Sequence, residues 1–133
     1  MRRLAVIAAA ALVMSACQTM QEAETVAPLG VDFSWRGVAA CTTASPAFTI
    51  SNVPAGATLL RFKMTDLDVP SYNHGGGSVA YTGGGEIPAG AFSYKGPCPP
   101  SGAHDYQFTV VAIDESQGLI VGRGEAVRPF PPE

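Results

Sequence analysis

The chain has 133 residues and a formal net charge of −3, with 8 basic and 11 acidic side chains. This acidic balance argues against a nucleic-acid-binding protein, because such proteins carry basic patches. The 15 glycines and 11 prolines leave little room for long helices, and they favour many short strands in one small domain.

The N-terminal residues have the pattern of a secretory signal. Arg2 and Arg3 precede eleven residues, Leu4 to Met14, whose side chains carry no polar atom. A run of eleven is too short for a membrane-spanning helix, which needs about 20 apolar residues. The segment Met14-Ser15-Ala16-Cys17 then resembles the lipobox of bacterial lipoproteins. We therefore expect a signal peptide at residues 1–16.

Cys17 is the residue that the lipobox resemblance marks for lipidation. Several acyl chains, such as palmitate, are enough for stable membrane anchoring. Gln18 follows instead of Asp, which by resemblance implies the outer membrane in a cell that has one. The alternative is an ordinary signal peptide cut nearby, with an incidental Cys17. Residues 17–32 show no sustained periodicity, so we expect the lipidated cysteine and a flexible tether there, followed by a β domain at residues 33–133.

Strand patterns follow one another along the rest of the chain. Leu59–Asp66 alternates between apolar and polar residues, which predicts a strand with one wet face. Asp105–Asp114 is apolar on both faces at its centre, as is typical of an interior strand. Weaker strand patterns occupy Phe33–Arg36, Ala47–Ile50, Ser78–Thr82, Phe92–Lys95 and Gly118–Arg128. No convincing helical stripe follows Cys17, so the sequence predicts an all-β, antiparallel sandwich with little or no helix.

Two cysteines, Cys41 and Cys98, remain beside Cys17. In an oxidising envelope compartment two such cysteines usually pair. The alternatives are two unpaired buried thiols or a thiolate nucleophile. Nothing in the sequence places a histidine beside either cysteine, so we expect a disulfide.

Polar residues gather at the ends of the predicted strands. Asp66 and Asp68 end the alternating strand, His74 lies in the next loop, and His104 and Tyr106 begin the strand that follows a proline-rich loop. Loops held by rigid strands are where binding residues concentrate. The aspartates could instead cap and solvate a strand end. They could also form a metal site with the histidines, but no short histidine spacing supports this.

The segment His74-Gly75-Gly76-Gly77 copies a lipase oxyanion motif. That motif requires a Gly-x-Ser-x-Gly elbow on an α/β sheet, and the sequence has no such elbow. A metal-assisted hydrolase remains only as an alternative.

A longer pattern carries more weight. It consists of three fragments in order: Asp66-x-Asp68-x-Pro70, then His74, then Gly96-Pro97-Cys98-Pro99-Pro100-Ser101-Gly102-Ala103-His104-Asp105-Tyr106. Together they resemble the phosphatidylethanolamine-binding protein (PEBP) family, and the resemblance extends over about residues 45–114. The resemblance implies a PEBP-like β fold in a short bacterial lipoprotein, with no enzymatic activity and no cofactor. It also implies a ligand-binding site made of Asp66, Asp68, His74, His104 and Tyr106, with Pro97 as a wall.

Two departures from the family pattern affect the predicted pocket. Gly75 stands where the family has a tryptophan, and Asp105 stands where it has an arginine. We therefore expect an open, less cationic pocket. Histidine and tyrosine donors suit a small anionic or zwitterionic ligand, such as a phosphate ester or a phospholipid headgroup. The alternative is a protein-interaction or inhibitor module that uses the same pocket rim.

Overall fold

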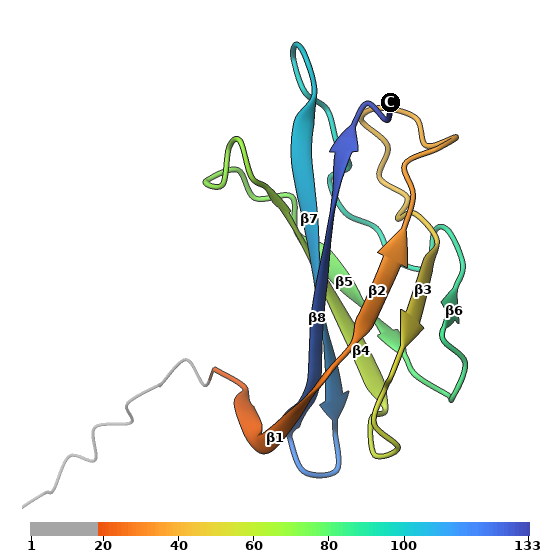
Figure 1. Cartoon of the computed structure of the whole chain (residues 1–133), viewed down its shortest axis with the longest axis vertical. Helices are drawn as coiled ribbons and strands as arrows, with labels where there is room; N and C mark the ends of the chain where they lie inside the picture. Colours follow the sequence, from red (N-terminus) through yellow and green to blue (C-terminus); the bar gives the residue numbers. More distant parts are fainter. Residues whose placement is uncertain (1–18) are drawn as a thin grey trace, which may run out of the picture.

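The computed structural model describes residues 19–133, and these residues form eight strands and no helix (Figure 1). The strands are β1 (Gln21–Pro28), β2 (Gly30–Phe33), β3 (Phe48–Ser51), β4 (Leu59–Asp66), β5 (Gly76–Ala80), β6 (Glu86–Ile87), β7 (His104–Asp114) and β8 (Leu119–Phe130). The predicted signal peptide at residues 1–16 and Cys17 lie outside the described residues. Within the described part, no helix could span a membrane. The all-β class predicted from the sequence is confirmed.

Two sheets enclose one core. The larger sheet has the order β1-β8-β7-β4-β5, and the smaller sheet has the order β2-β3-β6. Phe48 of the smaller sheet contacts Phe62 and Phe108 of the larger sheet, with 4.8 Å between ring centroids in both pairs. Aromatic rings in such offset or edge-on contacts stabilise a core beyond the area that they bury. The interior position predicted for residues 105–114 is also confirmed, because β7 lies between β4 and β8.

The tether predicted for residues 17–32 is wrong over most of its length. Residues 21–28 form β1, which pairs in parallel with β8, and residues 30–33 form β2. The larger sheet is therefore mixed, not wholly antiparallel. Met20 and Val26 pack against the outer-face cluster of Val111, Ile113 and Ile120. Burial of this cluster gives the N-terminal segment a reason to be ordered, although its own sequence has no clear periodicity.

Three weaker strand predictions need correction. Phe33–Arg36 contributes only its first residue to a strand, because β2 ends at Phe33. The strand predicted at Ser78–Thr82 begins two residues earlier, inside the glycine run. Phe92–Lys95 forms no strand, although Ser93 makes an isolated bridge to Ala44.

The glycine run after His74 has a structural explanation. Gly75 has a φ of +74°, a conformation that residues with a side chain rarely adopt. A Cβ on Gly76 would collide with the Phe62 carbonyl, and one on Gly77 would collide with the Phe92 side chain. The resemblance of this run to a lipase motif therefore reflects close packing of β5.

Candidate functional site

The candidate site lies where β4 ends and β7 begins, because Asp66 and Tyr106 are cross-strand partners. In Figure 1 this is the end of the sheet that also carries the end of β8. A pocket of about 380 Å³ opens here. It is lined by Asp66, Val69, Tyr72, His74, Cys98, Pro99, Pro100, His104 and Tyr106. Four of the six residues predicted to bind a ligand therefore meet in one pocket.

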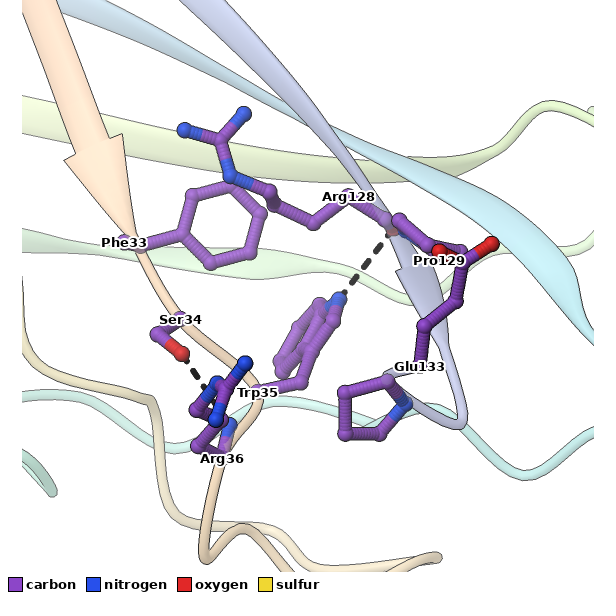
Figure 2. A pocket seen from close by; sticks show the side chains of 8 residues that line it. Phe33, Ser34, Trp35, Arg36, Arg128, Pro129 and Glu133 are labelled. Carbon is purple, nitrogen blue, oxygen red and sulfur yellow. Dashed lines mark hydrogen bonds between the residues drawn. The ribbon is translucent and has the colours of Figure 1, made fainter.

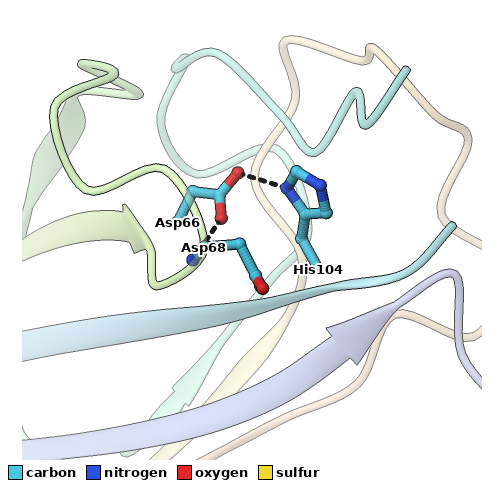
Figure 3. Close-up of side chains that lie close together, drawn as sticks. All are labelled: Asp66, Asp68 and His104. Atoms are coloured by element: carbon cyan, nitrogen blue, oxygen red, sulfur yellow. Dashed lines mark hydrogen bonds and ion pairs between the residues drawn. The ribbon is translucent and has the colours of Figure 1, made fainter. Parts of the chain in front are cut away.

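The Asp66 carboxylate is buried and fully engaged (Figure 3). Its Oδ1 accepts hydrogen bonds from the backbone N–H groups of Asp68 at 2.9 Å and Val69 at 3.1 Å. Its Oδ2 lies 2.7 Å from His104 Nδ1. Burial alone would raise the pKa of Asp66, but the hydrogen bonds from His104 and the two amides outweigh it and hold the pKa below 3.8. Asp66 is therefore an ionised anchor for His104.

His104 is oriented by this carboxylate. Its Nδ1 must carry the proton that it donates to Asp66, and Figure 3 shows its second ring nitrogen on the side away from Asp66. The hydrogen bond to Asp66 raises the pKa of His104 above its ordinary value of 6.5 and outweighs the opposing effect of burial. A protonated His104 offers an Nε2–H donor and a positive charge.

His74 presents the opposite hydrogen-bonding character when it is neutral. The side chain is buried, and its Nδ1 lies 2.6 Å from the Lys95 carbonyl oxygen. A carbonyl only accepts, so Nδ1 carries a proton and Nε2 of the neutral ring is an acceptor. The two histidines thus place a donor and an acceptor in one pocket.

Tyr106 forms the floor between the two histidines. Its ring stacks on His104 at 6.2 Å and meets His74 edge-on at 5.6 Å. Burial raises the pKa of Tyr106 to about 12, with the Asp66 charge acting in the same direction. The backbone of Cys98 opposes this rise in the pKa. Tyr106 is therefore a neutral, rigid surface.

The predicted disulfide between Cys41 and Cys98 is present, with a Cα–Cα distance of 4.6 Å. It ties the proline-rich loop to the loop after β2. The Cys41 N–H also donates to the Pro97 carbonyl at 2.8 Å. Since Cys98 lines the pocket, the disulfide is part of the pocket wall.

Two predicted site residues have supporting positions. Asp68 does not line the pocket; it is exposed, and its Oδ2 accepts a hydrogen bond from the Asp105 N–H at 2.8 Å. Pro97 is fully buried behind the wall formed by its neighbours. The sequence analysis missed several lining residues, namely Val69, Tyr72, Cys98, Pro99 and Pro100. Tyr72 could have been found, because it lies between two motif fragments.

Asp66, Asp68 and His104 bring possible metal-ligand atoms within 4.8 Å of one another. However, both Asp66 oxygens and one Asp68 oxygen already accept hydrogen bonds from within the protein. A metal ion would have to replace these bonds. The geometry therefore fits a self-contained ion pair better than a metal centre.

A second pocket, of about 340 Å³, lies beside Trp35 and the end of β8 (Figure 2). Its polar groups are largely satisfied by one another. The Trp35 indole N–H donates to the Arg128 carbonyl at 3.2 Å, and the Arg128 guanidinium binds Asp32 at 2.9 Å while lying over the Phe33 ring. This pocket is the weaker candidate.

Comparisons with known proteins found a similar sequence family and a similar fold. Residues 75–130 match the sequence model of the phosphatidylethanolamine-binding protein family, and the matched segment includes Pro97, His104 and Tyr106. The fold is similar to the crystal structure of a PEBP homologue from Chlamydia trachomatis, with a TM-score of 0.59 and 18% sequence identity. That alignment covers 80% of this chain and 99% of the chlamydial chain. A search of curated proteins found no match. The chain is therefore similar to the phosphatidylethanolamine-binding protein family over residues 75–130, and its fold is similar to that of a PEBP homologue.

Proposed function

We propose that this protein is a non-enzymatic binding protein for a small anionic or zwitterionic ligand, such as a phosphate ester or a phospholipid-headgroup-like molecule. One observation carries the proposal: His104, held by Asp66, lines the same pocket as His74. The family name points to a phospholipid headgroup as the prototype of such a ligand.

The hydrogen-bonding groups of the pocket suit a phosphorylated amine. Protonated His104 can donate to a phosphate oxygen, and a charge-assisted bond of this kind is stronger than a neutral one. Neutral His74 can accept from an ammonium or hydroxyl group. The Asp66 charge is balanced by His104, so it repels an incoming anion less than a free carboxylate would.

A non-catalytic role fits the side chains that line the pocket. Among the lining residues described, Cys98 is held in a disulfide and Asp66 is fully hydrogen-bonded. Neither is available as a nucleophile or a general base without breaking these bonds. The engagement of Cys98 and Asp66 therefore supports a binding role.

We further propose that the protein works in the cell envelope, anchored through a lipidated Cys17, on the periplasmic face of the outer membrane if the cell has one. The disulfide supports an oxidising compartment, since such bonds are rare in the cytosol. The Cys17 sequence context supports the anchor.

Titration calorimetry with phosphoethanolamine, inorganic phosphate and glycerol phosphate tests the binding function. We expect weak binding that strengthens as the pH falls through the pKa of His104, which is raised above 6.5, because His104 then gains its proton. His104→Ala should weaken phosphoethanolamine binding at least about tenfold, because it removes a bond to a charged group. Asp32→Asn, a change at an exposed residue that does not line this pocket, is the control. Binding that ignores both pH and His104, or no binding at all, would refute the proposal.

A second candidate function is protein docking at the pocket rim. Leu67, Val69 and Tyr72 are exposed by 42–52%, and all three lie on the loop between β4 and β5. Apolar side chains gathered at one rim can mark a protein-interaction site. A Leu67→Asp variant that binds small ligands normally but loses a protein partner would favour this alternative, because Leu67 is exposed and does not line the pocket.

A further inference from the structure

A cation that the family motif does not include contacts one of the residues that line the pocket. Lys95 Nζ lies over the Tyr72 ring, 5.7 Å from its centroid. Tyr72 lines the pocket, and its ring is 4.6 Å from the ring of His74. A cation over an aromatic face is attracted by the ring quadrupole. Tyr72 therefore holds the Lys95 ammonium beside the pocket.

The Lys95 backbone is fixed to the pocket as well. Its N–H donates to the His74 carbonyl at 2.9 Å, and its own carbonyl accepts the bond from His74 Nδ1 at 2.6 Å. The residue is thus joined to His74 by two hydrogen bonds and to Tyr72 by its side chain. A side chain attached to so constrained a backbone loses less entropy when it binds a ligand.

The charge of Lys95 is available for a ligand. Within residues 19–133, Lys95 forms no ion pair, whereas Arg123 and Arg128 are paired with acidic residues. None of the lining residues is a lysine or an arginine. Asp105 stands where the motif otherwise has an arginine, and Lys95 is a basic residue whose side chain contacts the lining residue Tyr72.

We propose that Lys95, positioned by Tyr72, is the recognition residue for the anionic group of the ligand. This inference rests on the proposed binding function and adds the orientation of the bound ligand. A zwitterion binds with its phosphate toward Lys95 and His104, and its amine lies away from Lys95. Lys95 thereby takes over the electrostatic role that the replaced arginine leaves open.

Titration of the full-length protein with phosphoethanolamine, inorganic phosphate and ethanolamine tests this inference. Lys95→Met should weaken both phosphate-containing probes about fivefold at low salt, as expected for an exposed charge pair. The loss should shrink at high salt because counterions screen exposed charges. Ethanolamine, which has no anionic group, should bind Lys95→Met as well as it binds wild type or more tightly.

Lys63→Met is the matched control, because Lys63 is an exposed lysine on the outer face of β4. It should leave all three affinities unchanged. Tyr72→Leu should weaken phosphate binding in the wild-type background and have a smaller effect in Lys95→Met, since the two residues act together.

The outcomes separate the two proposals. If wild type binds phosphoethanolamine through His104 but Lys95→Met has the same affinity and salt dependence, the Lys95 inference is overturned and the binding function stands. If wild type binds no probe, the binding function fails and this inference fails with it.

Discussion

Asp66 and His104 are separated by 38 residues in the chain and by 2.7 Å in space, between Oδ2 and Nδ1. The pair joins the end of β4 to the beginning of β7, so it contributes to folding as well as to the pocket. The ionisation of Asp66 and the protonation of His104 make the stability of the fold depend on pH in opposite directions.

The first prediction concerns the pH dependence of stability. The raised pKa of His104 adds stability below pH 6.5, which is lost as the pH rises through the folded-state value. The lowered pKa of Asp66 adds stability above pH 3.8, which is lost as the pH falls through its folded-state value. The stability advantage of wild type over His104→Asn should therefore be greatest between pH 3.8 and pH 6.5. Urea unfolding from pH 3 to 9 measures it, and an advantage that grows above pH 8 would contradict the ion pair.

The second prediction concerns the disulfide. Replacing both Cys41 and Cys98 by serine should lower the free energy of unfolding by up to about 4 kcal/mol in the chain-entropy model. It should also weaken ligand binding, because Cys98 lines the pocket. Denaturant titrations of wild type with and without reductant should reproduce the stability loss. Equal stability of oxidised wild type, reduced wild type and the double serine variant would argue against the pairing.

The third prediction concerns β1. Val26→Asp should destabilise the protein by about 1–3 kcal/mol, because it places a charge against the outer-face cluster. Thr25→Asp, at the exposed neighbouring position, should have little effect. Hydrogen exchange should show slow amides in Gln21–Pro28 if the strand is stably paired. Exchange as fast as in an unfolded peptide would restore the tether interpretation.

The fourth prediction concerns the glycine run. Gly77→Ala should cost about 1–3 kcal/mol, because the new Cβ would lie 2.7 Å from Phe92 Cγ. Gly84→Ala is the matched control, since nothing lies within 4 Å of the place that its new methyl group would occupy. Thermal unfolding of the two variants compares them directly, and similar losses of stability would show that packing of β5 is not the cause.

The fifth prediction concerns the anchor. Wild-type protein should partition with membranes and have the mass of an acylated chain. Cys17→Ser should remain unprocessed or become soluble, because the acceptor of the acyl chains is gone. An unmodified, wholly soluble wild-type protein would end the lipoprotein proposal.

Much of the central sheet could be predicted from local pattern. β4 has the bounds that the alternation in Leu59–Asp66 indicates, and β7 starts one residue before the predicted Asp105. These strands bury one or both faces, so the pattern of apolar residues within each strand indicates which side chains enter the core. β1 could not be predicted, because its order depends on pairing with β8, about a hundred residues away in the chain. The two-residue strand β6 carries too little sequence for a pattern.

The site was predictable in part for a similar reason. The motif included Asp66, His74, His104 and Tyr106. It did not reveal that the Asp66 carboxylate is hydrogen-bonded to His104 and orients its ring. It also did not reveal Lys95, whose contact with Tyr72 depends on how two loops approach each other.

The parallel pairing of β1 with β8 has a consequence for how an anchored molecule would stand on a lipid surface. Gln21 pairs with Leu119 near the β7–β8 hairpin, whereas His104 lies at the opposite end of β7. Eleven residues of strand separate the two ends by about 35 Å. The four-residue step from Cys17 to Gln21 can span at most about 14 Å. An upright molecule would therefore hold its pocket well above its own leaflet, where it could sample solutes and facing surfaces.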